Sequence, residues 1–129
     1  MAQVKIYGLH AHLNSCRDDL SDAIQQAAME TLGLPPEKRF HRFIGLDAAD
    51  FVYPADRSRQ YTIIEVSMFE GRTVETKKAF IRALFAGIHA RCGISPQDVE
   101  VTITETPREN WGIRGLPADE LALNYTVEV

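Results

Sequence analysis

The alternation of hydrophobic and polar positions predicts four β-strands. Each is short, rich in β-branched or aromatic residues, and repeats its apolar side chains with a period of two. The predicted strands span residues 2–9, 40–46, 61–68 and 99–104. A further alternation near the end of the chain, from Leu121 to Val129, predicts a last strand. We expect it to add to the sheet edge of a neighbouring subunit.

Two longer segments carry the apolar period of a helix that lies on a sheet, with apolar residues at i, i+3, i+4 and i+7. The first helix is predicted to run from Ser15, which with Asp18 resembles a capping box, to Leu32. The residues before it, 10–15, are predicted to be a polar connection. The second helix follows Thr73, a good N-cap, and stops at Gly93.

The predicted order strand, helix, strand occurs twice, in residues 2–46 and 61–104. The second copy echoes the first, because GLPPEKRFHRFI at 33–44 is matched by GISPQDVEVTIT at 93–104. Two such units side by side predict an α+β fold: a four-stranded mixed sheet with both helices on one face.

The length of 129 residues is enough for one core, so a single domain is expected over residues 1–129, with a C-terminal extension at 107–129. The sheet face without helices is assigned Ile64, Val66 and Met68, and we expect another subunit to cover it.

Charge and composition limit the kinds of partner and the cellular compartment that are expected for this chain. The net charge of -4 argues against broad nucleic-acid binding, which depends on neutralising phosphates. No apolar run approaches the roughly 20 residues of a membrane span, and no signal peptide precedes the first strand. Cys16 and Cys92 are far apart in the sequence, which favours reduced thiols and a cytoplasmic location.

Three stretches carry candidate chemistry. Arg72 stands at a strand end and helix start, where a guanidinium can meet an anion, although a solvated arginine is the alternative. His10 and His12 have metal-like spacing on an extended chain, but no third ligand is nearby and no metal site is expected. Cys16 lies where a helix N-terminus could favour a thiolate; the alternative is a small, partly buried side chain.

The doubled strand-helix-strand unit, the EGRT turn at 70–73 and the series CGISPQDVEV…E-x-P…W together resemble the tautomerase superfamily, which includes 4-oxalocrotonate tautomerase and macrophage migration inhibitory factor. The malonate semialdehyde decarboxylase-like branch is the most similar. It shares the elements at Gly33 to Phe40, Gly93 to Val99 and Trp111 to Gly115. The resemblance implies a homotrimer whose sheets form a barrel-like core, and keto–enol tautomerisation or related chemistry on small carbonyl acids without a cofactor.

The resemblance also implies a site. The family uses the amine of an N-terminal proline, and Ala2 holds that position here. If Met1 is removed, Ala2 offers a primary amine with an ordinary pKa of about 8, suited to a weaker base role or to a Schiff base. The implied binding residues are Arg72 for the substrate carboxylate, Lys38 and Arg39 beside it, and Trp111 as an apolar wall.

The sequence therefore leaves two alternative hypotheses for the function. One is a tautomerase-like protein with a basic pocket for a small carboxylate or keto acid at a subunit interface, its catalysis weak or altered because Ala2 replaces the proline. The other is a non-catalytic trimeric binding or structural protein on the same fold.

Overall fold

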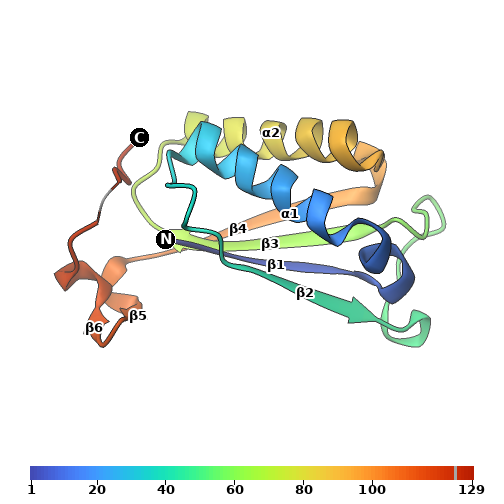
Figure 1. The fold of residues 1–129 in the computed structure, drawn as a ribbon, viewed down its shortest axis with the longest axis horizontal. Coiled ribbons are helices and arrows are strands. Elements are labelled where there is room, and N and C mark those ends of the chain that lie inside the picture. Colours follow the sequence, from blue (N-terminus) through green and yellow to red (C-terminus); the bar gives the residue numbers. More distant parts are fainter. Residues whose placement is uncertain (124) are drawn as a thin grey trace.

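The computed structural model describes residues 1–123 and 125–129 and has a four-stranded sheet with two helices on one face (Figure 1). Strand β1 pairs in parallel with β2 and antiparallel with β3, and β3 pairs in parallel with β4, giving the order β2-β1-β3-β4. The elements are β1 (Ala2–Leu9), α1 (His10–Leu32), β2 (His41–Leu46), β3 (Thr62–Phe69), α2 (Val74–Cys92), β4 (Val99–Thr106) and a small hairpin of β5 (Gly112–Ile113) and β6 (Leu116–Pro117). The predicted fold class is confirmed.

The internal repeat is visible in the backbone as well as in the sequence. Each helix ends at a glycine in the left-handed region, Gly33 with φ 67° and Gly93 with φ 70°. The residue that follows each glycine, Leu34 or Ile94, is buried in the core. Glycine adopts this conformation without the steric penalty that a Cβ would bring, so both helices stop at the same point of the repeat.

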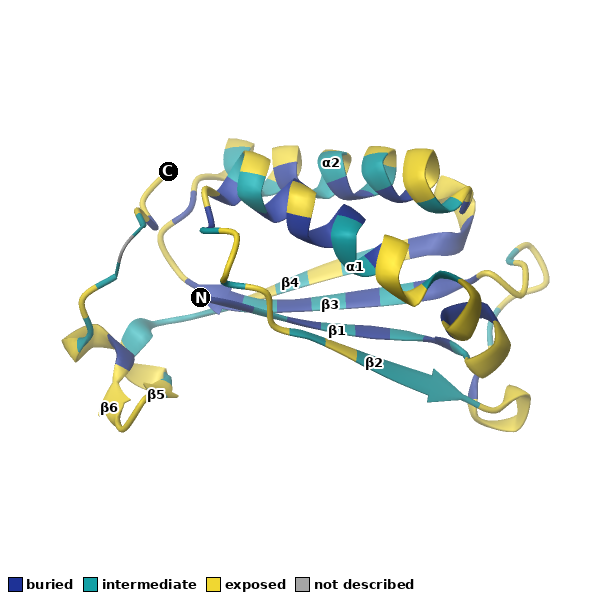
Figure 2. Cartoon of the chain, viewed as in Figure 1, coloured by how far each residue is buried: buried dark blue, intermediate teal, exposed yellow. Residues whose placement is uncertain are grey.

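The core lies between the sheet and the two helices, and every second residue of β3 points into it (Figure 2). Ile64, Val66 and Met68 are almost fully buried there, which corrects the prediction that they line the uncovered face. That face instead carries the half-buried Ile63 and Glu65. Alternation separates the two sides of a strand, but apolar residues at both Ile63 and Ile64 leave the choice of side to tertiary packing.

Helix α1 begins at His10, five residues before the predicted start. The presumed connection is its first turns, and Ser15 donates to the carbonyl oxygen of His12 instead of capping the helix. Leu13 is fully buried, and the His12 imidazole is hydrogen-bonded to Thr62 on β3 at 2.9 Å. Burial of these two side chains holds a polar stretch in a helix, because tertiary packing outweighs local preference.

The C-terminal residues follow the chain's own surface. No described residue in 121–123 or 125–129 is in a strand. The carbonyl oxygen of Val129 accepts hydrogen bonds from the Thr73 backbone N–H and the Thr76 hydroxyl, each at 2.9 Å. We call residues 121–129 the tail. Pairing of the tail with a neighbouring subunit stays a prediction, since one chain does not test it.

The loop between β2 and β3 lies at the opposite end of the sheet from the two chain termini (Figure 1). Phe51, Tyr53 and Tyr61 pack there with ring centroids 5.4 Å apart in each pair. Neither α1 nor α2 is long and apolar enough to cross a membrane, and these are the α-helices of the part of the chain that the structure describes.

Candidate functional site

Both chain termini lie on the side of the molecule where β1 begins and β3 ends, the N-terminus at the sheet and the C-terminus beside the start of α2 (Figure 1). Ala2 at the start of β1 pairs with Met68 near the end of β3, so Met1 is carried beside the turn that leads into α2. Met1 packs in a small hydrophobic cluster, separate from the main core, with Phe69, Ala118 and Val127. The first residue of the chain is thus enclosed by the tail.

The Met1 amine sits in an unusual environment for a chain terminus, since the residue is only 8% exposed. The pKa of this amine is lowered from 8.0 to about 4, mainly by burial and in smaller part by the positive charges of Arg72, Arg108 and Lys38. The amine is therefore neutral near pH 7, with a free lone pair available to take a proton or to attack a carbonyl carbon.

Arg72 is held by the turn between β3 and α2. Thr73 caps α2 by accepting from the Thr76 backbone N–H at 3.1 Å, as predicted, and this fixes the turn just before the helix. Arg72 is 5% exposed, and its Nη1 donates to the carbonyl oxygen of Phe69 at 3.4 Å. Its Nε and Nη2 have no hydrogen-bond partner among the described residues.

A buried guanidinium with two unsatisfied nitrogens is costly for a folded protein. Burial is the main cause that lowers the pKa of Arg72, which reflects the same cost. A bound carboxylate would remove it, because its two oxygens match the donor geometry of the guanidinium. The arrangement therefore suits an anion.

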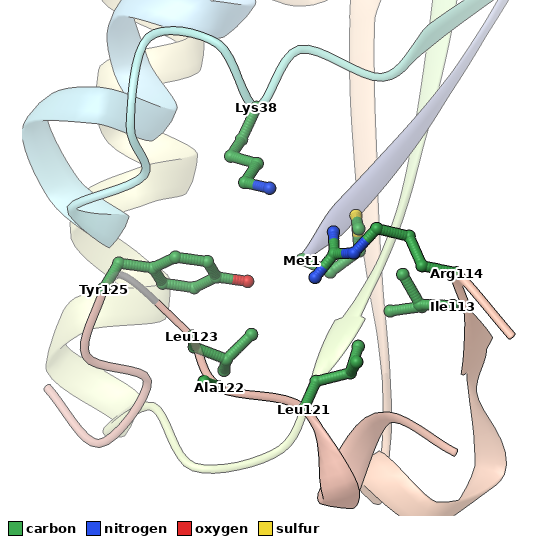
Figure 3. A pocket seen from close by; sticks show the side chains of 8 residues that line it. All are labelled: Met1, Lys38, Ile113, Arg114, Leu121, Ala122, Leu123 and Tyr125. Carbon is green, nitrogen blue, oxygen red and sulfur yellow. The ribbon is translucent and has the colours of Figure 1, made fainter. Parts of the chain in front are cut away.

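A cavity of about 230 Å³ opens beside the amine (Figure 3). Lys38 enters it from the loop between α1 and β2, and Tyr125 enters from the tail. The remaining lining residues are Met1, Ile113, Arg114, Leu121, Ala122 and Leu123. The cavity thus combines apolar walls with two cations, Lys38 and Arg114, at the side of a neutral amine.

The structure brings some of the sequence-predicted site residues together and separates others. Lys38 lines the cavity, Arg72 lies close enough to lower the pKa of the Met1 amine, and Ala2 is the buried residue next to it. Arg39 points elsewhere, with its Nη1 2.6 Å from an oxygen of Asp22 on α1.

Trp111 anchors the loop in which it lies. Its indole N–H donates to the Thr106 hydroxyl at the end of β4, and its ring meets Phe69 edge-on at 5.1 Å. Its carbonyl oxygen accepts from the Ala118 backbone N–H at 2.9 Å, across the base of the β5–β6 hairpin. These contacts anchor the hairpin next to the cavity, and Trp111 is not among the residues that line it.

Sequence reasoning missed Arg108, Arg114 and Tyr125. Arg108 lies over the Phe69 ring at 5.7 Å and has its Nη2 3.9 Å from an oxygen of Glu128. A signal was present, because Arg108 and Arg114 flank Trp111 three residues away on each side. Tyr125 gave no such signal, since its place in an alternating stretch is typical of a strand.

The other candidate chemistry does not assemble. His12 is bound to Thr62, and His10 has its Nε2 3.6 Å from Asp47. No three metal-type ligands gather anywhere in residues 1–123 or 125–129. Burial raises the pKa of the Cys16 thiol, opposite to the thiolate considered from the sequence, and its sulfur donates to the His12 carbonyl oxygen.

Comparison with known proteins agrees with this fold. A family model described as "Tautomerase enzyme" matches residues 38–114. A probable tautomerase, YusQ of Bacillus subtilis (strain 168), is 26% identical over 110 residues, covering 78% of this chain and 87% of the relative.

Two solved structures are similar over nearly their whole length. The FG41 malonate semialdehyde decarboxylase inhibited by 3-bromopropiolate superposes with a TM-score of 0.80 at 28% identity, covering 94% of this chain and 98% of that one. The Q0 fused 4-OT wild-type symmetric trimer superposes with a TM-score of 0.78 at 25% identity, covering 91% and 96%.

Proposed function

The chain belongs to the tautomerase enzyme family, and we propose that it uses the amine of its first residue to move a proton beside the carbonyl of a small carboxylate or keto acid. One observation carries the proposal. The Met1 amine is buried and uncharged near pH 7 at the edge of a cavity lined by Lys38 and Arg114, with Arg72 close by. A neutral base among cations can receive a proton from an anionic ligand that those cations hold.

Ligand binding would tune the base. Repulsion from Arg72, Arg108 and Lys38 contributes to the low pKa of the amine. A bound carboxylate offsets these charges, so the pKa of the amine rises toward the working pH, where a general base is most effective. In the reaction the amine nitrogen takes a proton from the carbon beside the carbonyl, and the bonding electrons form the enolate. The ammonium then returns the proton to the oxygen or to a second carbon.

Two forms of the first residue are compatible with this role. With Met1 present, its amine occupies the enclosed position described above. Removal of Met1 would shift a primary amine to Ala2, at the start of β1 and one residue nearer the core. We propose the Ala2 amine as the base of that processed form, with the same cations around it.

We propose further that the protein is a homotrimer with the cavity at a subunit interface. The trimeric assembly of the fused 4-OT relative supports this, and so does the sheet face left uncovered by α1 and α2 (Figure 2). Light scattering should return three times the chain mass of 14.5 kDa. A monomer mass would contradict the trimer without affecting the base assignment.

A binding function without turnover is the second candidate, and the low pKa of the amine favours it. An amine with a pKa of about 4 is a weak base, and the family's proline is replaced by alanine. In this case the same cations would hold a small carboxylate without proton transfer.

Turnover separates the two candidates. The experiment follows keto–enol interconversion of phenylpyruvate with protein that keeps Met1 and with protein that lacks it, the state of each being confirmed by mass spectrometry. We expect at least one form to exceed the uncatalysed rate and the Arg72→Met variant to lose that excess. Background rates in both forms, together with intact carboxylate binding by titration, would contradict catalysis and leave the binding function.

A further inference from the structure

The Tyr125 hydroxyl makes no hydrogen bond within the described residues of the protein. Its oxygen is also buried. A phenol that gives up water without a replacement partner costs free energy, so such groups are rare in folded chains. In Figure 3 the hydroxyl points into the cavity, toward Met1 and below Lys38.

Packing of its ring and anchoring of the residues that follow it restrain this tyrosine. Val127, two residues later, is fully buried. It packs tightly against Gly71, because a Cβ added at Gly71 would lie only 3.1 Å from the Cγ1 of Val127. Val129 is tied to the start of α2 by its bonds from Thr73 and Thr76. The Tyr125 ring packs on both hydrophobic clusters. A side chain restrained in this way loses little freedom when it binds a ligand.

The ligand group that best suits the Tyr125 hydroxyl is an uncharged oxygen that accepts a hydrogen bond. The cations at the cavity, Lys38 and Arg114, suit the carboxylate of a ligand, because ammonium and guanidinium groups make charge-assisted bonds to it. The phenol O–H is an uncharged donor, which suits a carbonyl oxygen one bond further along the ligand. The hydroxyl would also bind more tightly as that oxygen gains charge in an enolate.

We infer that Tyr125 donates a hydrogen bond to the carbonyl oxygen of the ligand, so that the cavity selects 2-oxo acids over carboxylic acids that lack the oxo group. The inference rests on the proposed function, since it assigns the remaining polar group of the same cavity. Tyr125 is then the residue that determines specificity for the oxygen, and the cations determine specificity for the carboxylate.

The test compares two ligands that differ only in the oxo group, 2-oxobutanoate and butanoate, by NMR titration of the full chain. For the unaltered protein we expect 2-oxobutanoate to bind about fivefold more tightly, the effect of one hydrogen bond between uncharged groups. Tyr125→Phe should lose this preference and keep the affinity for butanoate. Tyr53→Phe, which removes the same atom at the other end of the sheet, should leave the preference intact.

The outcomes separate this inference from the function on which it rests. Binding of both ligands with no preference, or a preference that survives Tyr125→Phe, would overturn the role of Tyr125 and leave the anion cavity standing. An equal loss of both ligands in Tyr125→Phe would make Tyr125 a structural residue and also overturn the inference. If neither ligand binds the unaltered protein, the proposed function fails and the inference falls with it.

Discussion

Two arginines at opposite ends of β3 differ in how their charge is satisfied. Arg57, before the strand, has one terminal nitrogen 2.6 Å from Asp56 and the other 3.0 Å from Glu100, and it lies over the Tyr61 ring. Arg72, after the strand, is more deeply buried and leaves two nitrogens without a partner in the described chain. At one end of the sheet the arginine is paired with carboxylates of the chain, whereas at the other end the guanidinium keeps unpaired donors, which under the proposed function would meet a ligand.

At the end of the sheet where Arg57 is paired, two hydrogen bonds to Asp98 hold a loop in place, and we call them the clamp. Asp98, before β4, accepts from the backbone N–H of Ser58 at 2.7 Å and from its hydroxyl at 2.5 Å. These bonds tie the long loop before β3 to the start of β4. At the other end the tail and the amine surround a cavity. The two ends differ in how far their donors are paired: among the described residues Arg57 lacks a partner only at Nε and has carboxylates at both terminal nitrogens, whereas Arg72 lacks a partner at Nε and Nη2.

The largest effect is expected from Arg72→Met, which keeps the length of the side chain and removes the charge. Binding of a small dicarboxylate should weaken by about 10- to 100-fold, because charge-assisted hydrogen bonds are lost. The unliganded protein should become more stable by about 1 to 3 kcal/mol, since a buried unpaired cation disappears. Titration calorimetry and urea unfolding measure the two changes.

The matched control is Arg57→Met, which should leave the affinity for the dicarboxylate unchanged, because this arginine is already paired at the other end of β3. Unchanged binding heat in Arg72→Met would end the proposal that this end of the sheet holds an anion.

A smaller effect is expected from Asp98→Ala at the paired end. The substitution leaves the part-buried Ser58 backbone N–H and hydroxyl without their acceptor, so the free energy of unfolding should fall by about 1 to 2 kcal/mol. Asp98→Asn keeps one acceptor oxygen and should recover part of the loss. Chemical denaturation measures both, and ligand affinity should not change. Stability equal to that of the unaltered protein would mean that the clamp is not needed.

A pH dependence of stability is expected from the buried Met1 amine. The folded Met1 amine has a pKa of about 4 against 8.0 for a free amine, so the unfolded chain binds more protons between these values. Stability should therefore fall as the pH is lowered from 8 to 4. Burial also lowers the pKa of His41 to about 4, which adds to the loss only below about pH 6.5.

Urea unfolding at several pH values separates the two groups. His41→Gln should flatten the profile below about pH 6.5 and leave the slope between pH 8 and 6.5, which reports on the amine. A stability that stays flat over that upper range would contradict a buried neutral amine.

Local pattern was sufficient for most of the fold. The second helix and its Thr73 cap, the left-handed glycines at 33 and 93, and the doubled unit follow from residues close together in the chain. Two expectations were wrong, the start of α1 and the covered face of β3. Both depend on what a side chain meets across the core: Thr62 for His12, and the helices for Ile64.

The family, the order of the elements and the position of Arg72 after the turn could be read from the sequence, since they rest on spacing and turn chemistry. Only the tertiary structure decided that Arg72 is buried without a partner, that Arg39 turns to Asp22, and that Tyr125 points into the cavity. The physical reason is distance along the chain. The proposed site joins residue 1, a turn near 72 and a tail near 125, and no local pattern encodes the burial and charge they share.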